Sequence, residues 1–207
     1  IAQESQTKLR KAQKSSEKPR KAQKSPEKRS KQKRMKDAPA TTIYLKDYAA
    51  PAYLIDNTDL AFDLFEDHAD VRSILHFAAN PAAARSDTLV LHGQELELKE
   101  LVLTGKTGAR VVVEASHYVI ADETLTIPSL SALLGDDTSS FELRCHTRIE
   151  PQNNTALEGL YKSKQMFCTQ CEAEGFRRIT YYLDRPDVMS SFVTTISAEK
   201  ARYPVLL

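Results

Sequence analysis

The sequence predicts an all-β fold, an antiparallel β-sandwich, that follows a charged low-complexity segment. From residue 41 onward, short runs of alternating or wholly apolar residues recur, and turn residues separate them at close spacing. Many residues in these runs are β-branched or aromatic, which is typical of strands that bury one face. Stretches with a helical period are few, and one of them, at residues 129–134, predicts a single turn. We therefore predict a β-domain over residues 41–207 and a separate segment over residues 1–40.

The leading segment is strongly basic and poor in large apolar residues. Residues 1–38 hold 14 lysines and arginines against four acidic residues, whereas the rest of the chain holds 15 against 24. The formal net charge of +1 is therefore a cancellation between two unlike parts. The near-repeat KAQKSSEK and KAQKSPEK, at residues 11–18 and 21–28, has no hydrophobic face that could stack into a solenoid. Because so little apolar surface can be buried, the segment is predicted to be disordered.

The strands are predicted in chain order from the apolar alternation. In the first, within residues 53–65, Leu60, Phe62 and Leu64 share one face. Further strands are predicted at residues 96–103, 110–114, 118–121, 125–127, 141–149, 179–183 and 192–196. Residues 203–207 read as an apolar strand without an exit turn, so we expect more protein beyond them.

Composition excludes some broad functions. A uniformly basic nucleic-acid-binding protein is excluded, because the part that can fold is acidic. No stretch approaches the roughly 20 apolar residues that cross a bilayer, so no membrane span is predicted. Three cysteines are too few for a disulfide framework, which favours a reducing compartment. We expect a cytoplasmic protein, with an organelle such as a plastid as the alternative.

The sequence contains no complete catalytic motif. No H-E-x-x-H, G-x-S-x-G, P-loop or G-x-G-x-x-G occurs, and the five histidines are scattered. Cys168 and Cys171 form a C-x-x-C, but Cys145 and the histidines lack zinc-ligand spacing. No βαβ setting supports a redox pair either, so these thiols are predicted to be packing residues. We predict no catalytic residue and no metal ligand in this chain.

The polar stretch at residues 170–174 has two interpretations. It is a solvated loop that enters a strand, which is the simpler interpretation. Alternatively, the carboxamide of Gln170 and the carboxylate of Glu172 receive a ligand ammonium through charge-assisted hydrogen bonds. The chemistry of the residues alone favours the first interpretation.

Several segments carry a family resemblance. They are PAYLI at 51–55, NTALEGLY at 154–161, CTQCEAEGF at 168–176, ITYYLDRPDV at 179–188 and YPVLL at 203–207. Together they resemble the aminopeptidase N family of zinc alanyl aminopeptidases, which are gluzincins, in its bacterial, plant and protozoan branch. The resemblance is dense from about residue 151, looser between residues 80 and 150, and absent before about residue 42.

The resemblance implies that the chain is the N-terminal β-domain of such an enzyme, with the saddle-like sandwich of the family, truncated before the catalytic domain. The zinc cofactor and its H-E-x-x-H helix belong to that missing domain, so the fragment alone is expected to be inactive. The partners implied are peptide substrates and the missing catalytic domain of the same chain. Gln170 and Glu172 match the family's Q-x-E, which grips the α-amino group of the substrate.

A different class of function stays open beside this one. The chain can be a non-catalytic β-sandwich binding module, in which the basic tail binds nucleic acid or acidic surfaces. The sequence disfavours nucleic acid as a partner, because the tail has no aromatic residue to stack on bases.

Overall fold

The computed structural model describes residues 44–205. The predicted disordered segment at residues 1–40 lies outside the described residues. The chain divides into two units, Ile1–Tyr48 and Ala49–Leu207. The described part of the first unit contains one 3-10 turn, η1 (Leu45–Asp47), none of whose residues is buried.

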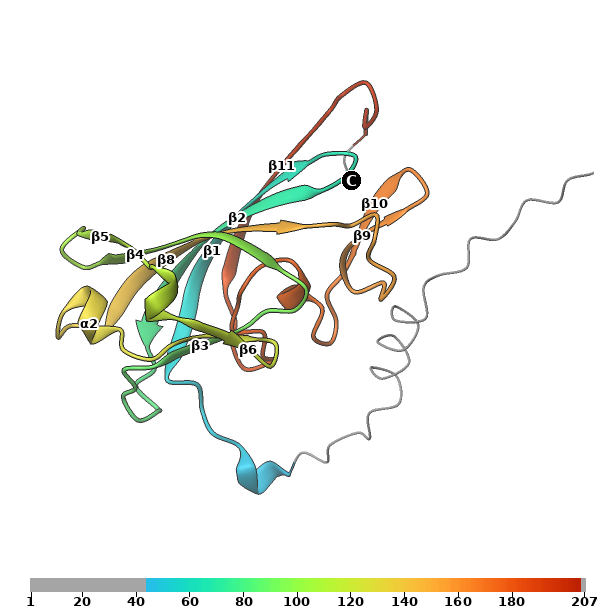
Figure 1. Ribbon diagram of the computed structural model, residues 1–207. Coiled ribbons are helices and arrows are strands. Elements are labelled where there is room, and N and C mark those ends of the chain that lie inside the picture. The colour runs from blue at the N-terminus through green and yellow to red at the C-terminus, as the bar shows by residue number, and fades with distance from the viewer. Residues whose placement is uncertain (1–43, 206–207) are drawn as a thin grey trace, which may run out of the picture. The chain divides into compact units, whose positions relative to one another are not determined.

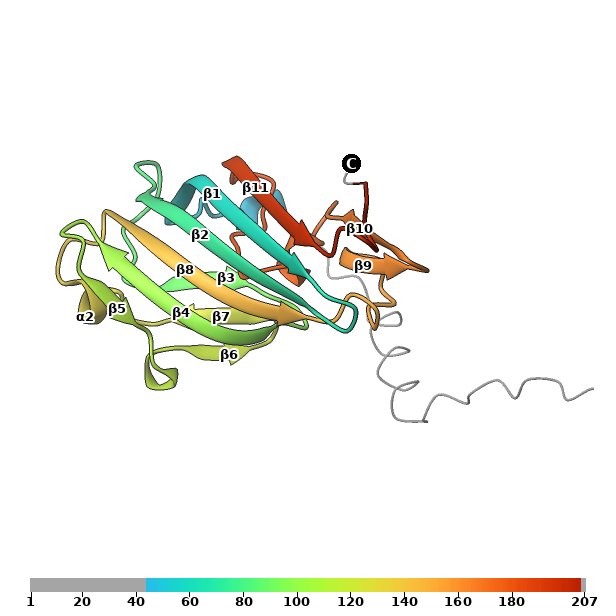
Figure 2. The same cartoon turned by 90° about the horizontal axis from the view of Figure 1, so that it is seen from above.

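The main layer of the second unit is a six-stranded sheet (Figures 1 and 2). Its strands in spatial order are β11 (Ser191–Ala198), β1 (Tyr53–Leu64), β2 (Ala69–Ala79), β8 (Ser140–Ile149), β4 (Glu97–Gly105) and β5 (Arg110–Val112). Neighbouring strands are antiparallel except β1 and β11, which run parallel. The prediction of an all-β, antiparallel fold is confirmed, and the parallel pair at one edge is an addition to it.

Smaller elements complete the unit. A three-stranded sheet has the order β3 (Leu89–His92), β7 (Thr124–Ile127) and β6 (Val119–Ala121). A hairpin pairs β9 (Gly159–Ser163) with β10 (Met166–Gln170). The helical turns are α2 (Ser131–Leu134), η2 (Ala115–His117) and η3 (Phe176–Arg178). The single helical turn predicted at residues 129–134 is therefore confirmed. Within residues 44–205, no helix is long and apolar enough to span a membrane.

A β-bulge in β1 keeps its apolar residues on one face. Tyr53 and Ile55 are buried, and so are Leu60 and Phe62, although the two pairs differ in parity. Ile55 pairs with Phe77 and Asn57 with His76, so residue 56 is an extra residue in the strand. Since side chains alternate along a strand, this one insertion returns the second half to the inner face.

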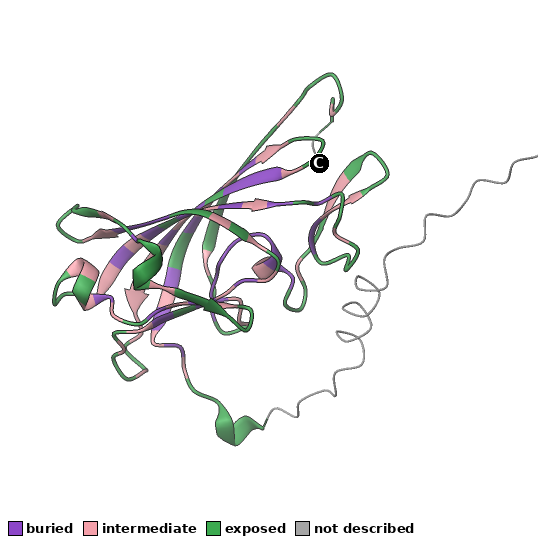
Figure 3. Ribbon diagram, viewed as in Figure 1, coloured by how far each residue is buried: buried purple, intermediate pink, exposed green. Residues whose placement is uncertain are grey.

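The core lies along the inner face of the large sheet and falls into two clusters. In β2, every second residue from Ala69 to Phe77 is buried, and β2 contributes to both clusters. One cluster includes residues of the three-stranded sheet, such as Leu91 and Ile127. The other lies at the opposite end of β1 and β2 and includes Leu160 and Ile179. Figure 3 shows the buried residues in the central strands and in the segment that precedes β11.

Two predicted strands are wrong and four observed strands were not predicted. Residues 179–183 form no strand, although all five are buried; their only β-pairing is an isolated bridge between Tyr182 and His92. Because these residues are buried under a sheet, their composition is as apolar as that of a buried strand, and the sequence pattern does not separate the two cases. Residues 203–205 also form no strand, and residues 206–207 lie outside the described part. The strands that the sequence analysis missed are β2, β3, β9 and β10.

Candidate functional site

The predicted site residues lie on one turn at the end of the β9–β10 hairpin. Gln170 is the last residue of β10 and pairs with Gly159 of β9. The chain then turns back, and the Gly175 N–H donates to the Cys171 carbonyl at 2.8 Å. We call residues 170–175 the anchor turn. It leads directly into η3 and from there beneath the large sheet.

Two glycines allow the backbones around the anchor turn to approach closely. A Cβ at Gly175 would lie 2.4 Å from the Gln170 carbonyl oxygen and 3.0 Å from the Gly159 nitrogen. A Cβ at Gly159 would lie 2.7 Å from the Arg178 Cβ, and Gly159 also has a positive φ of 68°. Larger residues are therefore excluded from both positions, at Gly175 by the backbone of residues 170 and 159 and at Gly159 by Arg178 of η3 and the Gly175 carbonyl.

The segment after the turn is fixed to the centre of the sheet by buried polar contacts. The Thr180 and Ser73 hydroxyls are 2.9 Å apart, and Thr147 Oγ1 donates to the Ile179 carbonyl at 3.0 Å. Tyr182 exchanges two backbone hydrogen bonds with His92 of β3. The anchor turn therefore stands on a rigid base rather than on a free loop.

The two carboxylates of the anchor turn have different surroundings. Glu172 is exposed, and within the described residues its carboxylate has no hydrogen-bond or ion-pair partner. Glu174 is also exposed, but its Oε2 lies 3.3 Å from Arg177 Nη1. The Gln170 Nε2 donates to the Glu172 backbone carbonyl at 3.1 Å, and the Gln170 Oε1 stays available as an acceptor. The structure thus places the Gln170 side chain against the Glu172 backbone, and the Glu172 carboxylate has no partner among the described residues.

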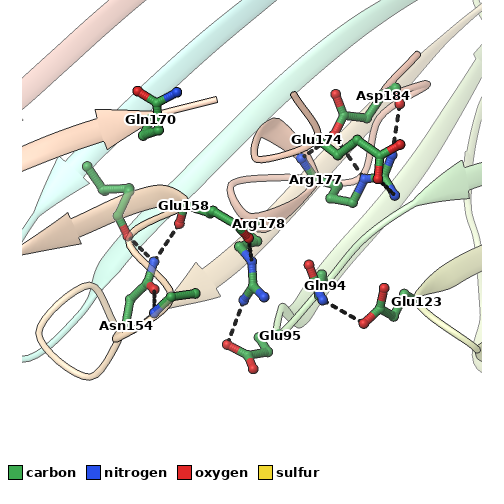
Figure 4. Close-up of polar contacts among 12 residues, drawn as sticks. Gln94, Glu95, Glu123, Asn154, Glu158, Gln170, Glu174, Arg177, Arg178 and Asp184 are labelled. Carbon is green, nitrogen blue, oxygen red and sulfur yellow. Dashed lines mark hydrogen bonds and ion pairs between the residues drawn. The ribbon is translucent and has the colours of Figure 1, made fainter. Parts of the chain in front are cut away.

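Arg177 is the residue that sequence reasoning missed (Figure 4). Its Nε and its backbone N–H both donate to Asp184 Oδ2, at 3.0 and 3.1 Å, and its Nη2 donates to the Asp184 carbonyl at 2.9 Å. The Arg177 and Asp184 side chains are only 13% and 12% exposed. Burial, and after it the Arg177 charge, lowers the pKa of the neighbouring His92. The available signal was a pair of arginines next to an exposed acidic turn, but the sequence does not show where each one points.

Arg178 points to the other side of η3. Its side chain is 4% exposed and donates to Glu95 at 2.9 Å and to Glu158 at 3.2 Å (Figure 4). It lines a cavity of about 340 Å³ that also includes Arg148 and Asn154. Neither Gln170 nor Glu172 lines this cavity, and both of its arginines are already paired with carboxylates. The cavity is therefore not the site that the anchor turn forms.

The cysteines and the metal-binding groups offer no further chemistry in the described part. Cys145, Cys168 and Cys171 are free thiols. Burial raises the pKa of Cys145 to about 12 and also raises the pKa of Cys171, so neither is an activated thiolate. Within residues 44–205, no group of three or more His, Cys, Asp or Glu side chains is placed to hold a metal ion.

The chain matches known proteins over most of its length. The family model of the Peptidase M1 N-terminal domain matches residues 55–206. Aminopeptidase N of Escherichia coli (strain K12) is 40% identical over 164 residues, which cover 79% of this chain and 17% of that protein. Aminopeptidase N of Caulobacter vibrioides is 36% identical over 173 residues, which cover 84% of this chain and 18% of that protein. The chain therefore spans less than a fifth of the length of these curated relatives.

The chain also resembles solved structures of peptidases. Legionella pneumophila aminopeptidase A, in complex with aspartic acid, has a TM-score of 0.69 and 28% identity, and the match covers 80% of this chain and 18% of that one. An M1 zinc metallopeptidase from Deinococcus radiodurans, bound to a Tyr-Ser-Ala substrate, has a TM-score of 0.55 at 16% identity, which shows a shared fold. That match covers 72% of this chain and 33% of the other. The chain belongs to the Peptidase M1 N-terminal domain family.

Proposed function

We propose that this chain is the N-terminal domain of a zinc aminopeptidase that removes N-terminal residues from peptides. In this proposal, Gln170 and Glu172 anchor the α-amino group of the substrate, and a following catalytic domain of the same protein carries out hydrolysis. The family membership and the aminopeptidase names of the relatives support the enzyme class. We further propose a cytoplasmic location, because three cysteines are too few for a disulfide framework.

The observation that carries the proposal is the uncommitted carboxylate of Glu172. A peptide N-terminus is an ammonium with three N–H donors, and a carboxylate is its strongest acceptor. The Gln170 Oε1 supplies a second acceptor on the same turn, because the Nε2 of that side chain is occupied by the Glu172 carbonyl. The rigid base of the turn keeps these two acceptors in place before the substrate arrives.

The proposed anchor also explains why the enzyme would prefer substrates with a free amino terminus. The Glu172 side chain is exposed in this chain. An exposed carboxylate has little desolvation cost in the free domain. Its attraction to a substrate ammonium becomes strongest when the bound substrate and a neighbouring domain exclude water from it. A mid-chain peptide bond brings no positive charge to that position, so a substrate with a free amino terminus is favoured.

Zinc does not fit the described residues of this chain, because they contain no suitable cluster of ligands. We therefore assign no metal-dependent step to these residues. Their roles are binding and positioning of the substrate amino terminus, not proton transfer.

The test is Glu172→Gln in the intact enzyme, assayed with an alanyl p-nitroanilide. Glutamine keeps the size of the side chain but removes its charge. We expect kcat/KM to fall about 10- to 150-fold, because the loss of a charged hydrogen bond costs roughly 1.5–3 kcal/mol.

Glu114→Gln is the matched control. Glu114 is also exposed, and its side chain has no partner among the described residues. Its kcat/KM should stay within about twofold of wild type. A Glu172→Gln enzyme with the kcat/KM of the control would remove Glu172 from the site and overturn the proposed anchor.

A further inference from the structure

We propose that Arg177 is a positioning residue that holds the anchor turn and reserves Glu172 for the substrate. This inference rests on the proposed function, because it concerns the site that binds the substrate amino group. It goes beyond that function by naming the residue on which the geometry of the site depends.

The first step is that the two carboxylates of the turn differ in their ion pairing. Glu172 and Glu174 are both exposed and are separated by one residue. A guanidinium near both could pair with either one and would then compete with the substrate ammonium. Instead, Arg177 Nη1 lies 3.3 Å from Glu174 Oε2, and Glu172 has no partner among the described residues. The ion pair therefore uses the second carboxylate and leaves the first one for a ligand.

The second step is the immobility of Arg177. Three donors of this residue converge on Asp184, two of them on the same carboxylate oxygen. Both side chains are almost nine-tenths buried, so these charge-assisted bonds act where solvent competes little. The Arg177 carbonyl also accepts the Gln94 N–H at 2.8 Å, which ties η3 to the segment after β3. The Arg177 side chain is thus held in one position, and its ion pair with Glu174 connects it to the anchor turn.

The third step is the fork geometry of the guanidinium. Arg177 contacts Glu174 with one terminal nitrogen while the other terminal nitrogen and Nε face Asp184. A lysine ammonium keeps the charge but is a single point at the end of a flexible stem, so it cannot bridge the two carboxylates in this way. The geometry of the fork, rather than its charge alone, is therefore the property to test.

The experiment uses the intact enzyme and two inhibitors that differ only in the α-amino group, L-alanine hydroxamate and propionohydroxamate. The inhibition constant of propionohydroxamate divided by that of L-alanine hydroxamate measures how much the α-amino group strengthens binding. Arg177→Lys should reduce this ratio on the order of 10-fold, as displacement of a supporting residue commonly does. The inhibition constant of propionohydroxamate should stay within about twofold, because that ligand does not use the anchor.

Two more variants keep the proposal falsifiable if Arg177→Lys folds poorly. Glu174→Gln alters a side chain that is 68% exposed and removes only the charge that pairs with Arg177, so it should fold and reduce the ratio about threefold. Arg178→Lys is the matched control, because Arg178 is adjacent, equally rich in ion pairs and buried, but its guanidinium contacts Glu95 and Glu158 instead of the turn. It should lower the melting temperature while keeping the wild-type ratio.

The outcomes separate this inference from the proposed function. An unchanged ratio in both Arg177→Lys and Glu174→Gln, or an equal weakening of both inhibitors, would overturn the positioning role of Arg177. An equal loss of the ratio in Arg178→Lys would overturn it as well. In each of these cases a reduced ratio in Glu172→Gln still supports the anchor, whereas an unchanged ratio in Glu172→Gln defeats the anchor itself.

Discussion

The charged cluster around Asp70 predicts a pH-dependent part of the stability of the β-domain. Asp70 of β2 faces Arg148 on the neighbouring strand β8 and accepts two hydrogen bonds from it, at 2.9 and 3.0 Å. The Nε2 atoms of His146 and His68 lie 3.4 and 3.7 Å from the Asp70 oxygens. The Asp70 side chain is 11% exposed, and chiefly the hydrogen bonds from Arg148 lower its pKa from the usual 3.8 to about 2.

The size of the effect follows from this difference in pKa. A carboxyl whose pKa falls by this amount on folding stabilises the folded state by at most about 2.5 kcal/mol. The Arg148 side chain is 38% exposed, so solvent screens part of the interaction, and we expect about 1–2 kcal/mol. Asp70→Asn should therefore reduce the free energy of unfolding by about 1–2 kcal/mol at neutral pH.

The pH dependence has a definite sign. Since the pKa is lower in the folded state, the stabilisation is fully present above the unfolded pKa of 3.8 and is lost as the pH falls through about 2. The difference between wild type and Asp70→Asn should still be present at about pH 4, should shrink as the pH falls toward 2 and should vanish below about pH 2. Urea unfolding followed by far-UV circular dichroism measures this difference at each pH, with the m value unchanged.

Asp63→Asn is the matched control for this prediction. Asp63 pairs with Arg72 on the neighbouring strand β2, but the two side chains are 33% and 53% exposed. Its substitution should cost less than about 0.5 kcal/mol. The reasoning would be refuted by a difference for Asp70→Asn that persists unchanged at pH 2, or by an equal loss in the control.

Two further predictions concern the anchor turn and the core. Gly175→Ala should lower the free energy of unfolding by about 1–3 kcal/mol, because the new Cβ would meet the Gln170 carbonyl oxygen at 2.4 Å. Gly105→Ala, whose Cβ would be 3.6 Å from its nearest neighbour, should change it by less than about 1 kcal/mol in the same urea titration, and equal effects of the two would contradict the close contact. Cys145 should resist a thiol reagent in the native protein at mildly alkaline pH, because burial raises its pKa to about 12. Peptide mapping after labelling checks this, and modification of Cys145 as fast as Cys168 would count against it.

The sequence determined those features that depend on local pattern. Alternation of apolar and polar residues is a direct consequence of the two-residue period of a strand, so the long strands β1, β4, β8 and β11 were predicted close to their observed positions. The segments shared with the aminopeptidase N family identified Gln170 and Glu172 as candidates. These inferences needed only the order of residues along the chain.

Pairing and orientation were decided by the tertiary structure. Strand β2 lies in the middle of the sheet, and its outer face mixes Asp70, Arg72 and Ile74, which hid the alternation that its inner face shows. Residues 179–183 have the composition of a strand, yet they cross beneath the sheet because buried hydroxyls fix them there. Local composition reports that a segment is buried, but not which neighbour buries it.

For the candidate site too, some features were visible in the sequence and others only in the tertiary structure. Sequence alone found the acidic turn and the carboxamide next to it. The chemistry of the residues did not distinguish Arg177 from its neighbour Arg178, and only the match to the family's Q-x-E singled out Glu172 from Glu174. Only the fold turns Arg177 toward Asp184 and Glu174 and Arg178 toward Glu95 and Glu158, so that Glu174 is ion-paired while the Glu172 carboxylate has no partner among the described residues.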